Sequence, residues 1–184
     1  MKKVKREDIL DFVTYEDIRE NIRKNVLTMK KDRRIHLGEH LTFLFENTET
    51  IKYQIQEMVR TERIVRESDI IHEIKTYNEL LGDDGGIGST LLIEISDSDQ
   101  RDLLLKKWLS LPRHIYLILE SGQRIYAEFD ERQIGEDRLS SVQYLKFNCN
   151  GQRPIKIGCD HEELTIENPL SEEQKEALFK DLKG

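Results

Sequence analysis

Two short turn signals, each between two apolar runs, constrain the fold of this chain more than any other feature. The turns are Gly38-Glu39, between the runs 35–37 and 41–45, and Ser121-Gly122, between the runs 114–119 and 124–129. A glycine-containing turn between β-type runs predicts a hairpin, whose two strands are antiparallel. The chain is therefore expected to contain an antiparallel sheet.

Further strands are expected at 90–95, 142–147, 155–157 and 164–166. The clearest of them is 142–147, where the side chains alternate. Val142, Tyr144 and Lys146 share one face of the expected strand, and Gln143, Leu145 and Phe147 share the other.

Helix signals lie at five places. The expected helices are 14–31, 47–63, 68–81, 97–112 and 171–183. Their starts are predicted from capping residues at Thr14, Asn47 or Thr48, Ser68, Asp97 or Ser98, and Ser171. In the first helix the apolar face is expected to be Tyr15, Ile18, Ile22, Val26 and Met29. Gly82 is expected to end the third helix in a left-handed conformation, and Pro112 to end the fourth.

Hairpins outnumber possible parallel crossovers, so these elements predict an α+β fold, with a largely antiparallel sheet and about five helices packed on it. At 184 residues and without a recognisable linker, the chain is expected to form one domain, 1–184. Within it we distinguish a helical region (residues 1–82), a strand-rich region (residues 89–167) and a C-terminal helix (residues 171–183).

The charge content excludes several classes of protein. The chain has 29 basic and 36 acidic residues, 65 in all, and a net charge of −7. No apolar run approaches the roughly 20 residues that a membrane-spanning helix needs. The N-terminus lacks the apolar stretch of a signal peptide, and two cysteines suit a reducing compartment. We therefore expect a cytoplasmic protein that does not interact with membranes.

The segment from His36 to His40 matches the H-x-x-E-H pattern of inverted zinc peptidases. That chemistry requires a helix, which places both histidines on one face beside the glutamate. Gly38 and the strand-like residues that follow predict a hairpin instead, in which the imidazoles point in different directions. The glycine-rich segment 82–89 lacks the Gly-Lys-Ser/Thr end of a phosphate-binding loop, and we interpret it as a flexible surface loop.

Metal ligation is an alternative hypothesis. The candidate ligands are His40 and His72, with Glu57 between them in sequence, and Cys159 with His161. The spacing of Cys149, Cys159 and His161 matches no established metal pattern, so two reduced cysteines are the simpler interpretation. No catalytic arrangement can be assembled from spacing alone, and we therefore name no catalytic residue and no cofactor.

Nucleic-acid binding is a weaker hypothesis. Residues 1–34 carry 11 basic and 7 acidic residues, and the basic ones gather between Arg23 and Arg34. The segment lacks interleaved aromatic residues and the protein as a whole is acidic. A solvated helix end, where cations favour the helix dipole, explains the cluster equally well.

A ladder of polar side chains on the second expected helix is the most distinctive candidate surface. Gln54, Glu57 and Thr61 share one side of that helix, and Gln56, Arg60 and Arg63 share another. Stacked amides, carboxylates and guanidiniums can bind a planar anion or the backbone of a partner, although a solvated helix with Glu–Arg pairs has the same spacing. The predicted binding surface is Gln54, Glu57, Arg60 and Arg63, with Arg33 and Arg34.

The strings Lys31–Gly38, Leu41–Glu46, Tyr53–Ile64, Tyr77–Leu80 and Thr90–Glu94 resemble a bacterial family of short proteins of unknown function. Members of that family are often encoded beside a rubrerythrin and a heterodisulfide-reductase-type iron–sulfur oxidoreductase. The resemblance covers roughly residues 5 to 130 and implies a setting in cytoplasmic redox or oxidative-stress metabolism. Our first hypothesis is therefore a non-catalytic accessory protein that docks an iron–sulfur oxidoreductase or a rubrerythrin-like protein.

Overall fold

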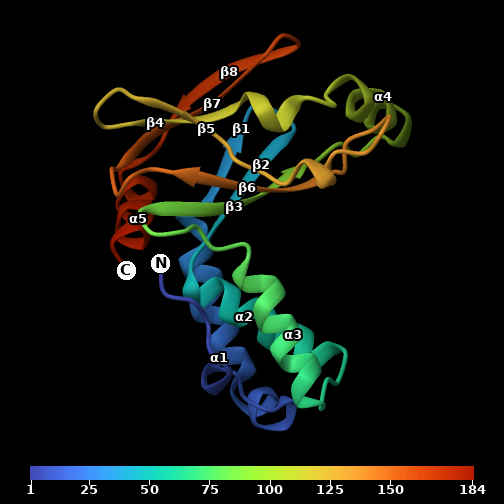
Figure 1. Cartoon of the computed structure of the whole chain (residues 1–184), viewed down its shortest axis with the longest axis vertical. Coiled ribbons are helices and arrows are strands. Elements are labelled where there is room, and N and C mark those ends of the chain that lie inside the picture. The colour runs from blue at the N-terminus through green and yellow to red at the C-terminus, as the bar shows by residue number, and fades with distance from the viewer.

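The computed structural model describes all residues from 1 to 184. The five α-helices are α1 (Phe12–Lys31), α2 (Thr48–Thr61), α3 (Glu67–Asn78), α4 (Ser98–Lys107) and α5 (Glu172–Lys183). The eight strands are β1 (Arg34–Leu37), β2 (Leu41–Glu46), β3 (Gly86–Ile93), β4 (Ile115–Leu119), β5 (Arg124–Tyr126), β6 (Val142–Asn148), β7 (Pro154–His161) and β8 (Leu164–Pro169). Figure 1 shows α1, α2 and α3 gathered on one side of the molecule and the strands on the other.

The strands form two four-stranded antiparallel sheets. Sheet A has the order β1-β2-β3-β6, and sheet B has the order β5-β4-β7-β8. An isolated β-bridge between Glu128, which follows β5, and Lys146 of β6 links sheet B to sheet A. The α+β class, the antiparallel pairing and the five helices are therefore confirmed. Two sheets are present where one was expected, and the hairpin β1–β2 pairs with β3, so the helical and strand-rich regions of the chain are interleaved.

The two sheets enclose a core of 25 buried residues, drawn from the inner faces of both. Helix α5 adds Leu178 and Leu182 to this core, and α4 with the turn behind it adds Leu105 and Trp108. Figure 1 shows these two helices at opposite ends of the sheets. The predicted alternation in β6 is confirmed, because Gln143, Leu145 and Phe147 are buried while their neighbours are not.

A second, smaller core of eight buried residues lies among the helices, and it is built from the N-terminal segment, α2, α3 and the turn after α3. Its members are Val4, Ile9, Ile51, Ile55, Val59, Ile70, Ile74 and Leu81. Helix α1 contributes to neither core: it buries only Tyr15 and Val26, and neither belongs to a hydrophobic cluster. Helices α1 to α3 therefore form a separate layer instead of packing on a sheet as expected.

Several local predictions are confirmed. Asn47 caps α2, Asp97 caps α4, and Ser171 forms a capping box with Gln174 at the start of α5. Both predicted hairpins form, and Gly38 adopts the positive φ of 65° that its turn requires. These signals are correct because each depends on hydrogen bonds within a few residues.

Other local predictions are wrong. Helix α1 begins two residues before Thr14, because the Asp11 carboxylate accepts hydrogen bonds from the backbone N–H groups of Val13 and Thr14. Helix α3 ends at Asn78, and Gly82 does not adopt a left-handed conformation. Strand β5 ends at Tyr126 rather than at 129.

The prediction of a surface loop at the glycine-rich segment 82–89 is also wrong, because half of this segment belongs to the buried strand β3. Its glycines permit a close crossing of two backbone segments. A Cβ atom placed on Gly88 would lie 1.8 Å from the carbonyl oxygen of Leu80. Only glycine therefore allows the chain that leaves α3 to pass over β3 at this distance.

A buried ion pair joins the helical layer to the sheets. Arg33, between α1 and β1, donates through Nε and Nη2 to the two carboxylate oxygens of Asp181 on α5, at 2.6 and 2.9 Å. Both side chains are about 8% exposed. Arg33 also donates to the carbonyl oxygen of Met29, and the Asn47 amide donates to Asp181 at 3.1 Å. The end of α1, the start of α2 and the C-terminal helix thus meet at one hydrogen-bonded junction.

Replacing Asp181 with alanine is expected to lower the free energy of unfolding by about 3–5 kcal/mol, because it leaves the Arg33 charge buried and unpaired. The double variant Arg33→Met with Asp181→Leu removes both charges and is expected to retain more stability than Asp181→Ala. Urea unfolding followed by circular dichroism measures both. The control is Arg34→Ala, at the exposed residue next to Arg33, and it should change the free energy of unfolding by no more than about 0.5 kcal/mol. Equal stability of Asp181→Ala and Arg34→Ala would contradict the assignment.

Candidate functional site

The carboxylate of Glu57, at the centre of the predicted ladder, holds α1 against α2. Its Oε1 accepts hydrogen bonds from Tyr15 Oη and Arg19 Nε, both at 2.7 Å, and its Oε2 accepts from Arg19 Nη2 at 2.9 Å. The hydrogen bonds from Arg19 lower the pKa of Glu57 in spite of its burial. Burial, together with the bond to Glu57, raises the pKa of Tyr15. Glu57 is therefore an ionised contact between two helices rather than a free ligand.

The other predicted ladder residues have different surroundings. Arg60 lies near Glu57 and near Glu16 of α1, at 3.6 Å from each carboxylate. Gln54 is half-buried. Arg63 is exposed after the end of α2, with a φ of 51°. The structure thus brings Glu57 and Arg60 together and places Gln54 and Arg63 elsewhere.

Gln56, the neighbour of Glu57, holds the N-terminal segment in place. Its side-chain amide makes two hydrogen bonds to the backbone of Leu10, accepting one from the N–H and donating one to the C=O, both at 2.9 Å. Gln56 is 3% exposed. Because a buried amide with both groups satisfied fixes the segment it binds, the chain before α1 has one position relative to α2.

Leu10, Tyr15 and Gln56 also line an apolar cavity, which we call the α1–α2 groove. Its volume is about 340 Å³, and its apolar lining is Leu10, Tyr15, Ile18, Ile22, Val26 and Tyr53. Its rim is polar, with Glu7, Asp8, Glu49, Lys52 and Gln56. A cavity of this size, mostly apolar with a few polar groups at the rim, has the composition typical of a binding site.

One apolar side chain on the groove face of α1 stays exposed. Ile18 is 41% exposed there, whereas Val13 and Leu27, 58% and 48% exposed, lie on the opposite side of the helix. The expected apolar face is therefore only partly buried: Tyr15 and Val26 are covered, whereas Ile18 is not. A surface helix normally buries its whole apolar stripe, and α1 leaves Ile18 of that stripe exposed.

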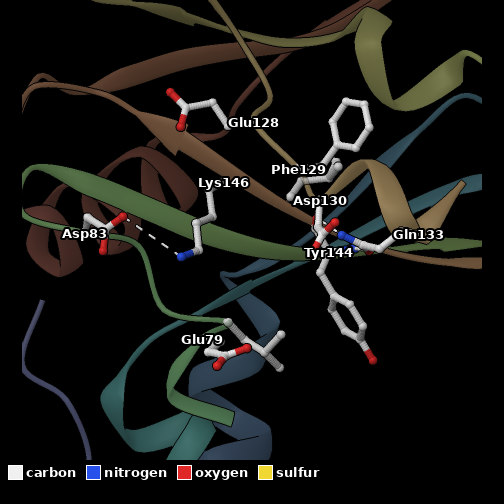
Figure 2. A pocket seen from close by; sticks show the side chains of 10 residues that line it. Glu79, Asp83, Glu128, Phe129, Asp130, Gln133, Tyr144 and Lys146 are labelled. Atoms are coloured by element: carbon white, nitrogen blue, oxygen red, sulfur yellow. Dashed lines mark hydrogen bonds and ion pairs between the residues drawn. The ribbon is translucent and has the colours of Figure 1, made fainter. Parts of the chain in front are cut away.

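A second cavity, of about 540 Å³, lies between the end of α3, strand β6 and the segment 128–133. Figure 2 shows Lys146 of β6 pointing toward Asp83, 3.9 Å away. Glu79, Glu128 and Asp130 also line it, so carboxylates outnumber the single cation. Hydrogen bonds from Arg132 hold the pKa of Asp130 at about 2. The cavity therefore has a negative potential at neutral pH, and its charge favours cations over anions.

The metal-ligand candidates do not converge. The structure has no group of three or more His, Cys, Asp or Glu side chains that could hold a metal ion. His40 lies in the β1–β2 turn, His72 is exposed on α3 and Glu57 is bound to Arg19. Cys159 and His161 are both buried in β7, and β6, which precedes Cys149, pairs with β3 instead of β7. The metal hypothesis thus lacks a geometric basis.

The H-x-x-E-H segment forms the predicted hairpin rather than a helix. His36 lies on β1, where its Nδ1 is 2.9 Å from Thr42 Oγ1, and the ring of His40 packs 5.9 Å from the ring of Trp108. Arg34 is exposed at the start of β1, whereas Arg33 is buried against Asp181. Arg33 is therefore not accessible as a binding residue.

Sequence reasoning missed Tyr15 and Arg19 as partners of Glu57, and the role of Leu10. The helical spacing places Tyr15 on a core face, and no pattern distinguishes Arg19. The spacing of the ladder pointed to the right helix, α2. It could not indicate that 38 to 46 residues of chain separate Glu57 and Gln56 from the groups they bind.

The fold and the groove together define a small α+β protein with a preformed apolar groove on its helical layer. The chain belongs to the family described as "Protein of unknown function (DUF3501)", which matches residues 3–182. It is also similar to a protein of unknown function from Burkholderia pseudomallei K96243 whose crystal structure is known. The two are 28% identical with a TM-score of 0.89, over 98% of this chain and 100% of that one. No curated protein matches the sequence, and no helix is long and apolar enough to cross a membrane.

The two cysteines are expected to be unreactive in the folded protein. Burial raises the pKa of the Cys149 thiol to about 12 and that of Cys159 to about 11, and the thiolate is the reactive form. With Ellman's reagent at pH 8, native protein should release almost no thionitrobenzoate, and protein in guanidinium should release two equivalents. Rapid reaction of either thiol in the native protein would contradict the observed burial.

Proposed function

We propose that this protein is a non-catalytic accessory protein whose α1–α2 groove docks a protein partner. The observation that carries the proposal is the state of α1: a 20-residue helix that buries only two residues and leaves Ile18 open beside a cavity. An exposed apolar patch with a polar rim is typical of a protein interaction site. The groove is large enough to accept one or two apolar side chains.

The basic second half of α1 favours an acidic partner, whereas the rim beside the N-terminal segment carries the carboxylates Glu7, Asp8 and Glu49. The second half of α1, from Ile22 to Lys31, contains Arg23, Lys24, Lys30 and Lys31 and no carboxylate. The salt bridges of α1 all involve Glu16, Arg19 or Glu20, in the first half of the helix. The cations of the second half are thus available to carboxylates from outside. An acidic segment with apolar side chains, such as an amphipathic helix, fits both properties.

The ladder residues have a positioning role in this proposal. Glu57 ties α1 to α2 through Tyr15 and Arg19, and Gln56 ties Leu10 to α2. They fix the width of the groove before a partner arrives, which reduces the entropy lost on binding. The side chain of Arg60 is 29% exposed and lies at the edge of the contact that Glu57 makes with α1.

The proposed partner is an iron–sulfur oxidoreductase or a rubrerythrin-like protein of cytoplasmic redox or oxidative-stress metabolism. This assignment is supported by the resemblance of the sequence to a family encoded beside such proteins. The alternative of a metal-dependent enzyme has no converging ligands to support it. The cations of α1 would also suit nucleic acid, which makes a duplex oligonucleotide a necessary competitor in the binding assay.

The variant Ile18→Asp is expected to weaken binding to the partner about tenfold or more, because it puts a carboxylate into the apolar surface beside the groove. Binding of each purified candidate partner would be measured by isothermal titration calorimetry, with circular dichroism confirming that the variant is folded. The matched control is Ile71→Asp, since Ile71 is an apolar residue of α3 that is 52% exposed and lies outside the groove.

The proposal fails if Ile18→Asp and Ile71→Asp bind a partner with the same affinity as the unmodified protein. It also fails if neither candidate partner binds while the duplex oligonucleotide binds with a strong salt dependence.

A further inference from the structure

A buried histidine closes the tight turn between β7 and β8. His161 pairs with Leu164 across the two turn residues Glu162 and Glu163, and we call these four residues the 161–164 turn. Figure 1 shows this turn at the end of sheet B that lies far from α1, α2 and α3. His161 is only 3% exposed, so its ring nitrogens depend on the protein for hydrogen-bond partners.

One hydrogen bond determines the protonation state that the 161–164 turn requires. Nδ1 of His161 accepts from the backbone N–H of Glu163 at 3.3 Å. A ring nitrogen that accepts a hydrogen bond carries no proton, so His161 is neutral in this structure and has its proton on Nε2. An imidazolium has an N–H on both nitrogens and cannot make this bond.

A second imidazole packs against the first. His114 ends the short 3-10 helix Leu111–His114 before β4, and its ring meets that of His161 edge-on, with 5.1 Å between the ring centres. Nδ1 of His114 lies 3.0 Å from Oδ1 of Asp160, which also accepts a hydrogen bond from Tyr126 Oη at 2.6 Å. The pairing of Ile115 with Cys159 fixes the two backbone segments beside each other. The two rings are therefore held in contact by the sheet.

Charged groups reach His161 from each element packed around it, namely the turn, β7, the 3-10 helix and the end of α4. These groups are Lys107, Arg113, His114, Asp160, Glu162 and Glu163. Lys107 of α4 lies 3.5 Å from the carboxylate of Glu163, and Arg113 is paired with Glu131. Burial and the charge of His114 lower the pKa of His161, and they outweigh the opposite effect of Glu162 and Glu163.

We propose that His161 is a pH-sensitive switch whose protonation opens the 161–164 turn. Protonation removes the acceptor of the Glu163 N–H and places two N–H groups against each other. It also places a positive charge in a buried position beside His114, where a polar group without a partner is costly. Opening the turn brings His161 into water and separates Glu163 from Lys107. The rest of β7 stays in place, because residues 154–159 pair with both β4 and β8.

The direction of the switch follows from the lowered pKa of His161. A histidine that binds its proton less readily in the folded protein than in the unfolded chain favours the fold above its unfolded pKa, and this contribution is lost as the pH falls. The ordinary pKa of histidine is 6.5. The turn is therefore closed at neutral and basic pH, and it opens progressively below about pH 6.5.

The test uses NMR on the full-length protein labelled with ¹⁵N. At pH 8 the ring nitrogens of His161 should show the tautomer with the proton on Nε2. Between pH 7.5 and pH 5.5 the protection factor of the Glu163 amide, which corrects its exchange rate for pH, is expected to fall about tenfold. The amides of β4 should keep their protection.

Two variants separate the switch from a general effect of acid. His161→Gln has a side-chain oxygen that can accept from Glu163 and does not titrate, so the protection of that amide should no longer depend on pH. His114→Gln removes the neighbouring charge, and the midpoint of the change at Glu163 should move to higher pH. The matched control is His72→Gln, at an exposed histidine of α3, which should behave as the unmodified protein.

The proposal is overturned if the protection of the Glu163 amide is the same at both pH values in the unmodified protein. It is also overturned if His161 carries its proton on Nδ1 at pH 8, or if the midpoint is the same in His114→Gln and His72→Gln.

Discussion

The buried ion pair between Arg33 and Asp181 is the contact on which the arrangement of this molecule depends. It is the point where the end of α1, the start of α2 and the C-terminal helix α5 meet, and Asn47 joins it while also capping α2. Glu46 lies next to Asn47 in the chain, and burial raises the pKa of its carboxyl, which accepts a hydrogen bond from Thr50. A buried pair of this kind contributes less to net stability than to fixing one arrangement, because burying two charges costs most of what their attraction returns.

Helix α1 leaves that junction without a hydrophobic core of its own. Hydrogen bonds join it to α2, and Glu57 accepts them from Tyr15 and Arg19. Directional hydrogen bonds can therefore position the helix while its apolar side chains stay open, as Ile18 does. In a helix held by apolar packing, those same side chains would be buried in the core. The polar ladder of α2 thus explains how the groove beside α1 can exist in the free protein.

The features of the fold that depend on near neighbours in sequence were predictable. Hairpin turns, the caps at Asn47 and Ser171 and the alternation along β6 each follow from residues a few positions apart. The division into two sheets was not predictable, because β3 pairs with β6 across 50 to 62 residues and no pattern in either strand indicates which strand it pairs with. For the same reason Arg33 was expected on a binding surface, since its partner Asp181 is 148 residues away.

The candidate site residues were likewise predictable only where their neighbours in sequence determine their position. Glu57 was identified by its helical spacing, but the direction in which it faces is set by Arg19 on another helix. Cys159 and His161 are close in sequence, which made them conspicuous, yet burial in the sheets leaves the thiol without a role in binding.

The central claim is that the partner occupies the α1–α2 groove and not the ladder residues directly. Hydrogen–deuterium exchange, measured with and without the partner, tests it most directly because it reports on every backbone segment at once. We predict slower exchange in residues 7–29 and in the first two turns of α2, with sheet B and α3 unchanged. Slower exchange confined to α3, to sheet B or to the segment around Arg63, with α1 unaffected, would contradict it.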